Sequence, residues 1–216
     1  MTDLLIRPET NAQPRNSYVA DRPIEFEAWL YLSENIDSEL VKGVMVNRMA
    51  AQYPHEWIFM WLATLLSQYA ETRGLGVILG SRTAVKIDRY NGRLPDILFV
   101  RAENAAIIHK DAIYGAPDLV IEIVSPSNYQ SDIIALETDY CSIGVPEIVF
   151  VDPQRKQARV LRKSDADQYE DFSLTNGPLE LRAMPGFQIE IEWIFAEPRP
   201  LTLDVITRLL EQAAGE

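Results

Sequence analysis

Glu122 is an acidic residue at a position where an acidic residue needs an explanation. It interrupts the apolar run 119–124, a pattern that predicts a strand covered on both faces. An ionised carboxylate removed from water is strongly destabilising unless a cation, a metal ion or hydrogen-bond donors compensate for it. A strand with one wetter face is the simpler alternative. Glu122 is therefore the first candidate for a functional side chain.

Asp96 is the second candidate carboxylate. It follows Pro95 at the start of an expected strand over residues 94–101, where an aspartate that only caps a turn is the alternative interpretation. If this strand neighbours the strand of Glu122, the two carboxylates converge. Magnesium or manganese suits such a pair, because these hard cations are held by one or two carboxylates together with water and substrate phosphate. The clusters of Cys and His that zinc requires are absent from the sequence.

The two carboxylates depend on a central unit, residues 117–153, whose pattern predicts a strand, a turn, a helix and a second strand. Residues 38–47 predict a hairpin with a two-residue turn at Lys42-Gly43, and Glu39 opens its first strand. Residues 82–88 predict a further strand, joined to the strand of Asp96 by a loop with an Asn-Gly turn signal.

Helices are predicted on either side of this unit. Residues 54–71 are apolar around most of the helical circumference, which favours either a central core helix or an extra face used in a homodimer. His55 in the first turn of this helix is interpreted as a surface residue. Asp21 is expected to cap a helix over residues 23–33, and Thr202 is expected to cap a last helix. Short alternating runs predict an antiparallel meander that extends the sheet, over residues 158–162, 169–173, 179–183 and 187–191.

The composition indicates one globular domain. The chain has 216 residues, of which 47% are hydrophobic and 24% charged, enough for one well-buried core. We expect a flexible N-terminal arm over residues 1–20, the domain over 21–195, and a C-terminal helix over 196–216 packed on the domain or on a partner. Cys141 is the single cysteine and no apolar run reaches membrane-spanning length, which predicts a cytoplasmic protein without disulfides or membrane spans. The net charge of −12 argues against a general DNA-coating protein.

Several motifs occur in an order that resembles the Uma-type family of restriction endonucleases. They are SELVKGVMV with Glu39, GRLPDILFV with Asp96, APDLVIEIVSPS with Glu122, then Asp132, Tyr140, GVPE and VDP. The resemblance implies an α/β (α+β) fold of the restriction-endonuclease-like PD-(D/E)xK type, a mixed central sheet flanked by helices, here with a C-terminal antiparallel extension. It also implies hydrolysis of phosphodiester bonds in nucleic acid with magnesium or manganese. DNA is the favoured substrate. Asp96 and Glu122 would be the metal ligands and Glu39 an accessory carboxylate.

The chain departs from this family at the lysine. Members of this family usually have a catalytic lysine on the helix after the glutamate, at the position that Leu136 occupies here. A leucine cannot position the attacking water or offset charge that develops on the phosphate. Lys86 is the preferred substitute, because its strand could neighbour Asp96. The other candidates are Lys42 and Lys110.

Two functions therefore stay open. The first is a metal-dependent endonuclease, acting as a homodimer so that two sites reach one duplex. The second is a protein that retains the fold without catalysis and binds a protein or nucleic-acid partner. The carboxylates favour the first function, and Leu136 together with the net charge of −12 favours the second.

Overall fold

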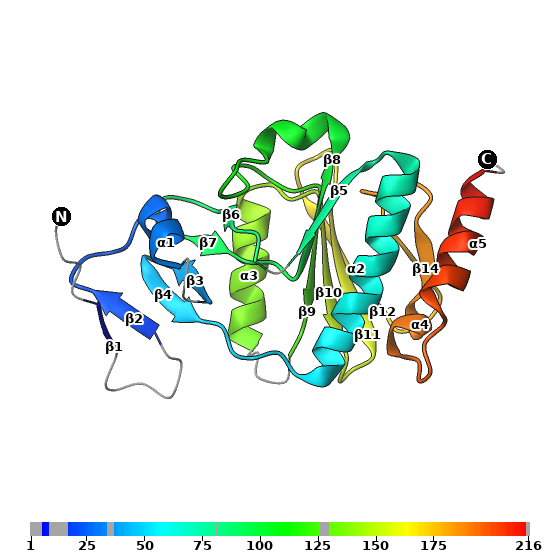
Figure 1. Ribbon diagram of the computed structural model, residues 1–216, viewed down its shortest axis with the longest axis horizontal. Helices are drawn as coiled ribbons and strands as arrows, with labels where there is room; N and C mark the ends of the chain where they lie inside the picture. The colour runs from blue at the N-terminus through cyan, green and yellow to red at the C-terminus, as the bar shows by residue number, and fades with distance from the viewer. Residues whose placement is uncertain (1–5, 9–16, 34–36, 81, 126–129, 215–216) are drawn as a thin grey trace.

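A computed structural model describes residues 6–8, 17–33, 37–80, 82–125 and 130–214. A six-stranded sheet with helices on both faces forms its centre, and a second sheet of shorter strands lies beside it (Figure 1). This is the mixed sheet flanked by helices that the sequence predicts. Within the described ranges, no helix combines the length and the apolar character that a membrane crossing requires.

The central sheet has the strand order β12-β11-β10-β9-β8-β5. Strands β9 and β10 run parallel, and the other neighbouring pairs are antiparallel. Every residue of β9 and β10 is buried, as the apolar runs predict for strands covered on both faces. The strands are β5 Gly76–Gly80, β8 Ile97–Arg101, β9 Leu119–Ile123, β10 Glu147–Asp152, β11 Gln157–Lys163 and β12 Tyr169–Leu174.

Helix α3, Gln130–Ser142, connects the parallel pair, because parallel neighbours need a crossover between them. The predicted strand–helix–strand unit is therefore confirmed. Alternation along β9 sends Ile121 and Ile123 into the core on the α2 side, whereas Val120 packs with Tyr140 of α3. Glu122 consequently projects toward α3.

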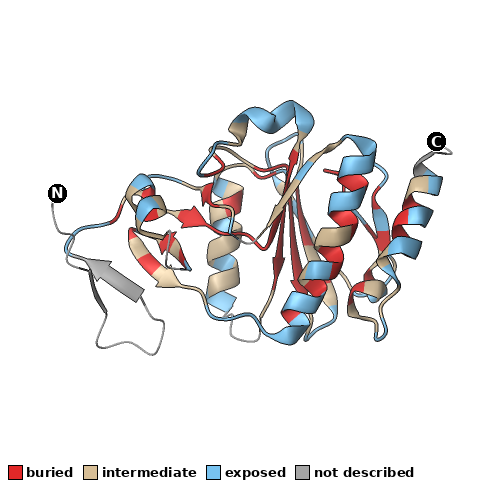
Figure 2. Ribbon diagram, viewed as in Figure 1, coloured by how far each residue is buried: buried red, intermediate tan, exposed pale blue. Residues whose placement is uncertain are grey.

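Helix α2, Tyr53–Arg73, covers the opposite face of the central sheet together with α4, Ile191–Phe195, and α5, Thr202–Ala214. Figure 2 shows buried residues on one side of α2 and exposed residues on its outer side. The prediction of a core helix is thus confirmed, although large apolar side chains remain on the outer side. A 3₁₀ helix, η2 Ala102–Ile107, follows β8.

The second sheet has the order β1-β2-β4-β3-β7-β6 and packs against α1, Phe26–Leu32. The predicted hairpin is confirmed, since Val41 pairs with Val44 and leaves Lys42-Gly43 as the loop. Both loop residues have positive φ, 51° and 75°, as a type I′ turn requires. The strands are β1 Ile6–Pro8, β2 Ser17–Ala20, β3 Ser38–Val41, β4 Val44–Asn47, β6 Val85–Lys86 and β7 Gly92–Arg93.

Two predictions of strand pairing were wrong. The strand expected over residues 82–88 does not pair with the strand of Asp96: β6 pairs with β7 in the second sheet, whereas β8 joins the central sheet. Of the expected meander, β11 and β12 do extend the central sheet, but β13, Pro178–Glu180, and β14, Gln188–Glu190, form a separate two-stranded sheet.

The chain termini also differ from expectation. The N-terminal arm contains β1 and β2, and β2 pairs with β4 and so extends the hairpin; residues 1–5 and 9–16 of that arm lie outside the described residues. The N-cap of α1 is Glu25 rather than Asp21. In α5, the buried face is made by residues such as Ile206 and Leu209, whereas Leu203 is exposed.

Candidate active site

Asp96 and Glu122 lie on neighbouring strands, as their predicted convergence required. Strands β8 and β9 pair antiparallel with Ile97 opposite Ile121, so continuing this register by one residue places Asp96 opposite Glu122. Directly opposed residues of an antiparallel pair project from the same face of the sheet. Both side chains are largely buried, with 2% of Asp96 and 9% of Glu122 exposed.

The Asp96 carboxylate is surrounded by donors from three parts of the chain. Its Oδ1 accepts from the Arg48 guanidinium at 3.1 Å, and its Oδ2 lies 3.0 Å from His55 Nε2 and accepts from the Ile123 N–H at 2.9 Å. Burial alone would raise the pKa of Asp96, but these donors and the charges of His55 and Arg48 outweigh burial and lower it. Asp96 is therefore the ionised carboxylate of the pair.

The pKa of Glu122 moves in the opposite direction. Its Oε1 accepts a hydrogen bond from the Tyr140 hydroxyl at 2.5 Å. Burial, followed by the negative charges of Asp96 and Glu39, raises the pKa of Glu122 well above its usual range, and the Tyr140 hydrogen bond and Arg48 offset this only in part. Two neighbouring carboxyls whose pKa values are pushed apart can serve different roles in one site.

His55 responds to the same cluster. Burial opposes its charged form, yet the hydrogen bond to Asp96 and the charge of that residue, reinforced by Glu56, raise the pKa of His55. Asp96 thus has an arginine and a histidine of raised pKa on its two oxygens.

Glu39 is fixed at the edge of this cluster. Its Oε2 accepts from Arg93 at 2.8 Å and its Oε1 accepts from the Leu94 N–H at 3.2 Å. Arg93 also donates to Asp139 of α3 at 2.7 Å, so this buried guanidinium ties β3, β7 and α3 together. The charge of Glu39 contributes to the raised pKa of Glu122, which agrees with an accessory carboxylate that borders the pair.

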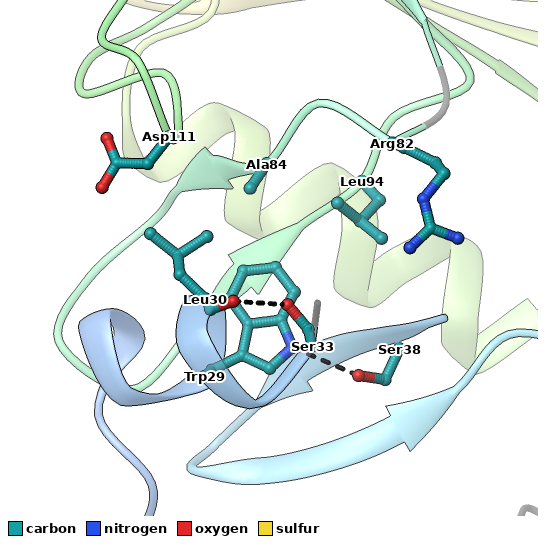
Figure 3. Close-up of a pocket in the computed structure, with 8 residues that line it drawn as sticks. All are labelled: Trp29, Leu30, Ser33, Ser38, Arg82, Ala84, Leu94 and Asp111. Carbon is teal, nitrogen blue, oxygen red and sulfur yellow. Dashed lines mark hydrogen bonds between the residues drawn. The ribbon is translucent and has the colours of Figure 1, made fainter. Parts of the chain in front are cut away.

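A separate pocket lies on the other side of the hairpin. Its volume is about 270 Å³, and Figure 3 shows Trp29 in it, whose indole N–H donates to Ser38 Oγ at 3.2 Å. Because Ser38 and Glu39 are consecutive strand residues, their side chains point to opposite faces of β3. The pocket is lined by Trp29, Leu30, Ser33, Ser38, Arg82, Ala84, Leu94 and Asp111, and neither Asp96 nor Glu122 lines it.

The comparisons with known proteins identify a family and a shared fold. The Uma2 family, described as "Putative restriction endonuclease", matches residues 23–200. The chain belongs to this family. A crystal structure titled as a putative nuclease belonging to DUF820 from Anabaena variabilis ATCC 29413 has a TM-score of 0.68 and 18% sequence identity, covering 80% of this chain and 98% of that one. At that identity the likeness concerns the fold. No curated protein matches the chain.

Leu136 occupies the position where the resemblance implies a lysine. Leu136 is partly buried against the apolar cluster between α3 and the central sheet. Lys86, the predicted substitute, bonds to Glu27, and its ammonium lies 5.4 Å from the ring centre of Phe26 and 5.3 Å from that of Tyr114. Its strand β6 pairs with β7 rather than with β8, so the reason for preferring Lys86 does not hold. A catalytic role for Lys86 stays a prediction without geometric support.

Three further residues of the candidate site were not assigned to the carboxylates from the sequence, although Tyr140 was among the motif residues. His55 was interpreted as a surface residue, and this was wrong, because it is 9% exposed and contacts Asp96. A signal was present: His55 precedes buried Ile58 by three positions and buried Leu62 by seven, the spacing of one helical face. For Arg48 and Tyr140, no sequence pattern indicated a contact with the carboxylates.

The donor set suits a hard cation under one condition. Among the residues that the structure describes, no group of three or more His, Cys, Asp and Glu side chains is placed to hold a metal ion. Magnesium, however, is commonly held by one or two carboxylates completed by water and substrate oxygens. Ionised Asp96 meets this requirement directly, whereas Glu122 must lose its proton first. The pair therefore fits magnesium or manganese when Glu122 is deprotonated.

Proposed function

We propose that this chain is a metal-dependent endonuclease that hydrolyses phosphodiester bonds in nucleic acid, with DNA as the favoured substrate. The observation that supports this most directly is the register of β8 and β9, which sets Asp96 opposite Glu122 at a buried position of the central sheet. Membership of a family described as "Putative restriction endonuclease" agrees with this reaction class.

Asp96 and Glu122 are the residues that would hold magnesium or manganese. The ion would polarise the scissile phosphate and lower the pKa of the attacking water. Asp96 contributes a standing negative charge, and Glu122 contributes a second one when its carboxyl proton leaves to solvent. Tyr140 orients the Glu122 carboxyl through its hydroxyl, and Arg93 fixes Glu39 at the border of the site.

The test is cleavage of duplex DNA by the parent protein in manganese and in magnesium, beside Asp96→Asn and Glu122→Gln. Both variants are expected to lose at least about a hundredfold in rate, because each removes a charge that the reaction needs. Glu103→Gln is the matched control, since it neutralises an exposed carboxylate on η2 and should cut like the parent. A parent that cuts nothing, or cleavage that persists in both site variants, would reject the proposal.

A non-catalytic nucleic-acid-binding function is the second candidate. It is favoured by Leu136, which is partly buried against the apolar cluster between α3 and the central sheet, at the position where the resemblance implies a lysine. This function predicts that the parent binds duplex DNA with an affinity that falls steeply with salt, yet leaves it uncut in either metal.

We further propose that the chain acts as a homodimer in the cytoplasm. The exposed outer side of α2 carries Trp57 and Met60, and Leu201 and Leu203 are exposed at the start of α5, which contacts α2. These four residues are called the α2–α5 face below. Exposed apolar side chains gathered on adjacent elements are typical of protein interfaces.

A further inference from the structure

We propose that Arg48 carries the positive charge of this site, in place of the lysine that Leu136 replaces. The inference rests on the proposed endonuclease function and names the residue that would face the scissile phosphate. Arg48 follows directly after β4. The charge would thus have moved from a helix to the end of a hairpin.

The hairpin brings the Arg48 guanidinium into contact with Asp96. The backbone N–H of Arg48 donates to the Asp37 carbonyl at 2.9 Å, which closes the end of the β3–β4 hairpin. Its guanidinium donates to Asp96 Oδ1 at 3.1 Å. Burial opposes its charge, but Asp96, Glu39 and Glu122 together outweigh burial and raise the pKa of Arg48. Arg48 is therefore electrostatically coupled to each proposed acidic residue.

Two other cations of this region bond to different carboxylates. Arg93 is only 6% exposed and bonds to Glu39 and Asp139, so it acts as a buried clamp. Lys86 bonds to Glu27. Arg48 is 24% exposed, so part of its side chain meets solvent while its guanidinium contacts Asp96. Among the described residues, this combination of contact and exposure suits Arg48 best for meeting an incoming phosphate.

The chemistry needs only a charge that stays in place. The oxygen of a water molecule attacks phosphorus and gives one proton to solvent. One ester P–O bond breaks with its electron pair on the leaving oxygen, and that oxygen takes a proton from solvent. A guanidinium stays protonated throughout and presents five N–H donors in a rigid fork. Arg48 would donate to a non-bridging phosphate oxygen as negative charge grows there.

The experiment compares Arg48→Ala and Arg48→Lys with the parent. Arg48→Ala should lower kcat about a hundredfold, the usual effect of losing one stabiliser of transition-state charge. Its affinity for manganese, measured by calorimetry, should stay equal or rise, because a cation that competes for Asp96 has gone. A residue that merely supported the fold would lower both quantities. Arg89→Ala, which removes an exposed arginine paired with Glu25, is the control and should leave kcat unchanged.

A relocated charge completes the test. Leu136 lies one helical turn before Tyr140, whose hydroxyl touches Glu122, so a lysine at 136 starts from the face of α3 that meets the site. The double variant Arg48→Ala with Leu136→Lys should regain at least about tenfold in kcat over Arg48→Ala. Recovery in this variant or in Arg48→Lys supports the inference.

The outcomes separate the two proposals. If the parent cuts DNA and Asp96→Asn abolishes cutting, but Arg48→Ala keeps parental kcat, the role of Arg48 is overturned and the endonuclease stands. Loss of cutting in Arg48→Ala that neither lysine variant restores also overturns it. A parent that cuts nothing in either metal overturns both.

Discussion

Asp96 and Glu122 face each other across two strands, yet their pKa values move in opposite directions. The difference comes from their partners. Asp96 has Arg48, His55 and a backbone N–H on its oxygens, whereas Glu122 has the neutral Tyr140 hydroxyl and lies against two other carboxylates. The buried negative charge of Asp96 is compensated by these donors, whereas a second negative charge on Glu122 would not be compensated. In the metal-free site, Asp96 therefore ionises at lower pH than Glu122.

Glu122→Gln should stabilise the metal-free protein at high pH. A group whose folded-state pKa is raised contributes stability below its unfolded pKa, about 4.3 for Glu, and loses it as pH rises through the folded-state pKa. Glutamine cannot ionise, so the variant avoids this loss. Each tenfold difference between the acid dissociation constants of the folded and unfolded states corresponds to about 1.4 kcal/mol, or about 3 to 5 °C in a domain of this size.

Thermal melts in chelator between pH 4 and pH 8 measure this effect. The melting temperature of Glu122→Gln minus that of the parent should increase with pH over this interval. Glu103→Gln is the control, because its carboxylate is exposed and its difference from the parent should stay flat. A flat difference for Glu122→Gln as well would mean that Glu122 ionises normally in the folded protein.

At the residue level, a candidate could be selected from the sequence where one position violated the pattern around it. Glu122 stood out because a carboxylate interrupted an apolar strand, and Asp96 because it opened the neighbouring one. Arg48 could not be found in this way, because an arginine after an exposed-looking hairpin is ordinary. Its importance depends on a contact between residues 48 positions apart, which only the folded chain reveals.

At the scale of elements, local signals were sufficient and non-local ones were not. The Lys42-Gly43 turn and the β9–α3–β10 unit follow from neighbouring residues, and both were predicted. The assignment of β6 to the second sheet depends on the partner strand β7 and on packing of Val85, which no local pattern encodes. This error led directly to the preference for Lys86.

Leu136→Lys alone should destabilise the protein modestly. Leu136 packs against the cluster between α3 and the central sheet, so the substitution removes apolar contacts and brings an ammonium close to them. A lysine can extend its charge toward water, which limits the loss to about 1 to 2 kcal/mol, or about 2 to 8 °C. Leu136→Met, which conserves volume, should melt within about 2 °C of the parent. An unchanged melt for the lysine variant would indicate that the position already has polar surroundings.

The whole molecule presents a charge that opposes its proposed substrate. With a net charge of −12, long-range attraction to DNA is absent, so binding must depend on local groups and on metal at the carboxyl pair. A dimer would help, because two copies related by a two-fold axis bring two sites to one duplex. The α2–α5 face is the surface that offers apolar area for such an assembly.

Homodimer formation through the α2–α5 face is the prediction at this scale. Trp57 is 51% and Met60 57% exposed, and the face continues onto α5, where Leu203 is 70% exposed. Helix α2 is also joined to the segment before α5 by a hydrogen bond, because Trp61 donates its indole N–H to the Pro200 carbonyl at 3.0 Å. Light scattering of the parent should therefore give twice the chain mass of 24.5 kDa at micromolar concentration.

Trp57→Glu should weaken this dimer strongly. Replacing a large aromatic anchor at an interface costs about 2 kcal/mol or more, which raises the dissociation constant at least about thirtyfold. Tyr31→Ser is the matched control, because Tyr31 on α1 is equally prominent at 77% exposure but lies outside the α2–α5 face. Two results would show that the α2–α5 face is not the interface: a parent that stays at 24.5 kDa at high concentration, or a dimer that Tyr31→Ser rather than Trp57→Glu dissociates. A double-strand cut would then need two separate encounters with the DNA.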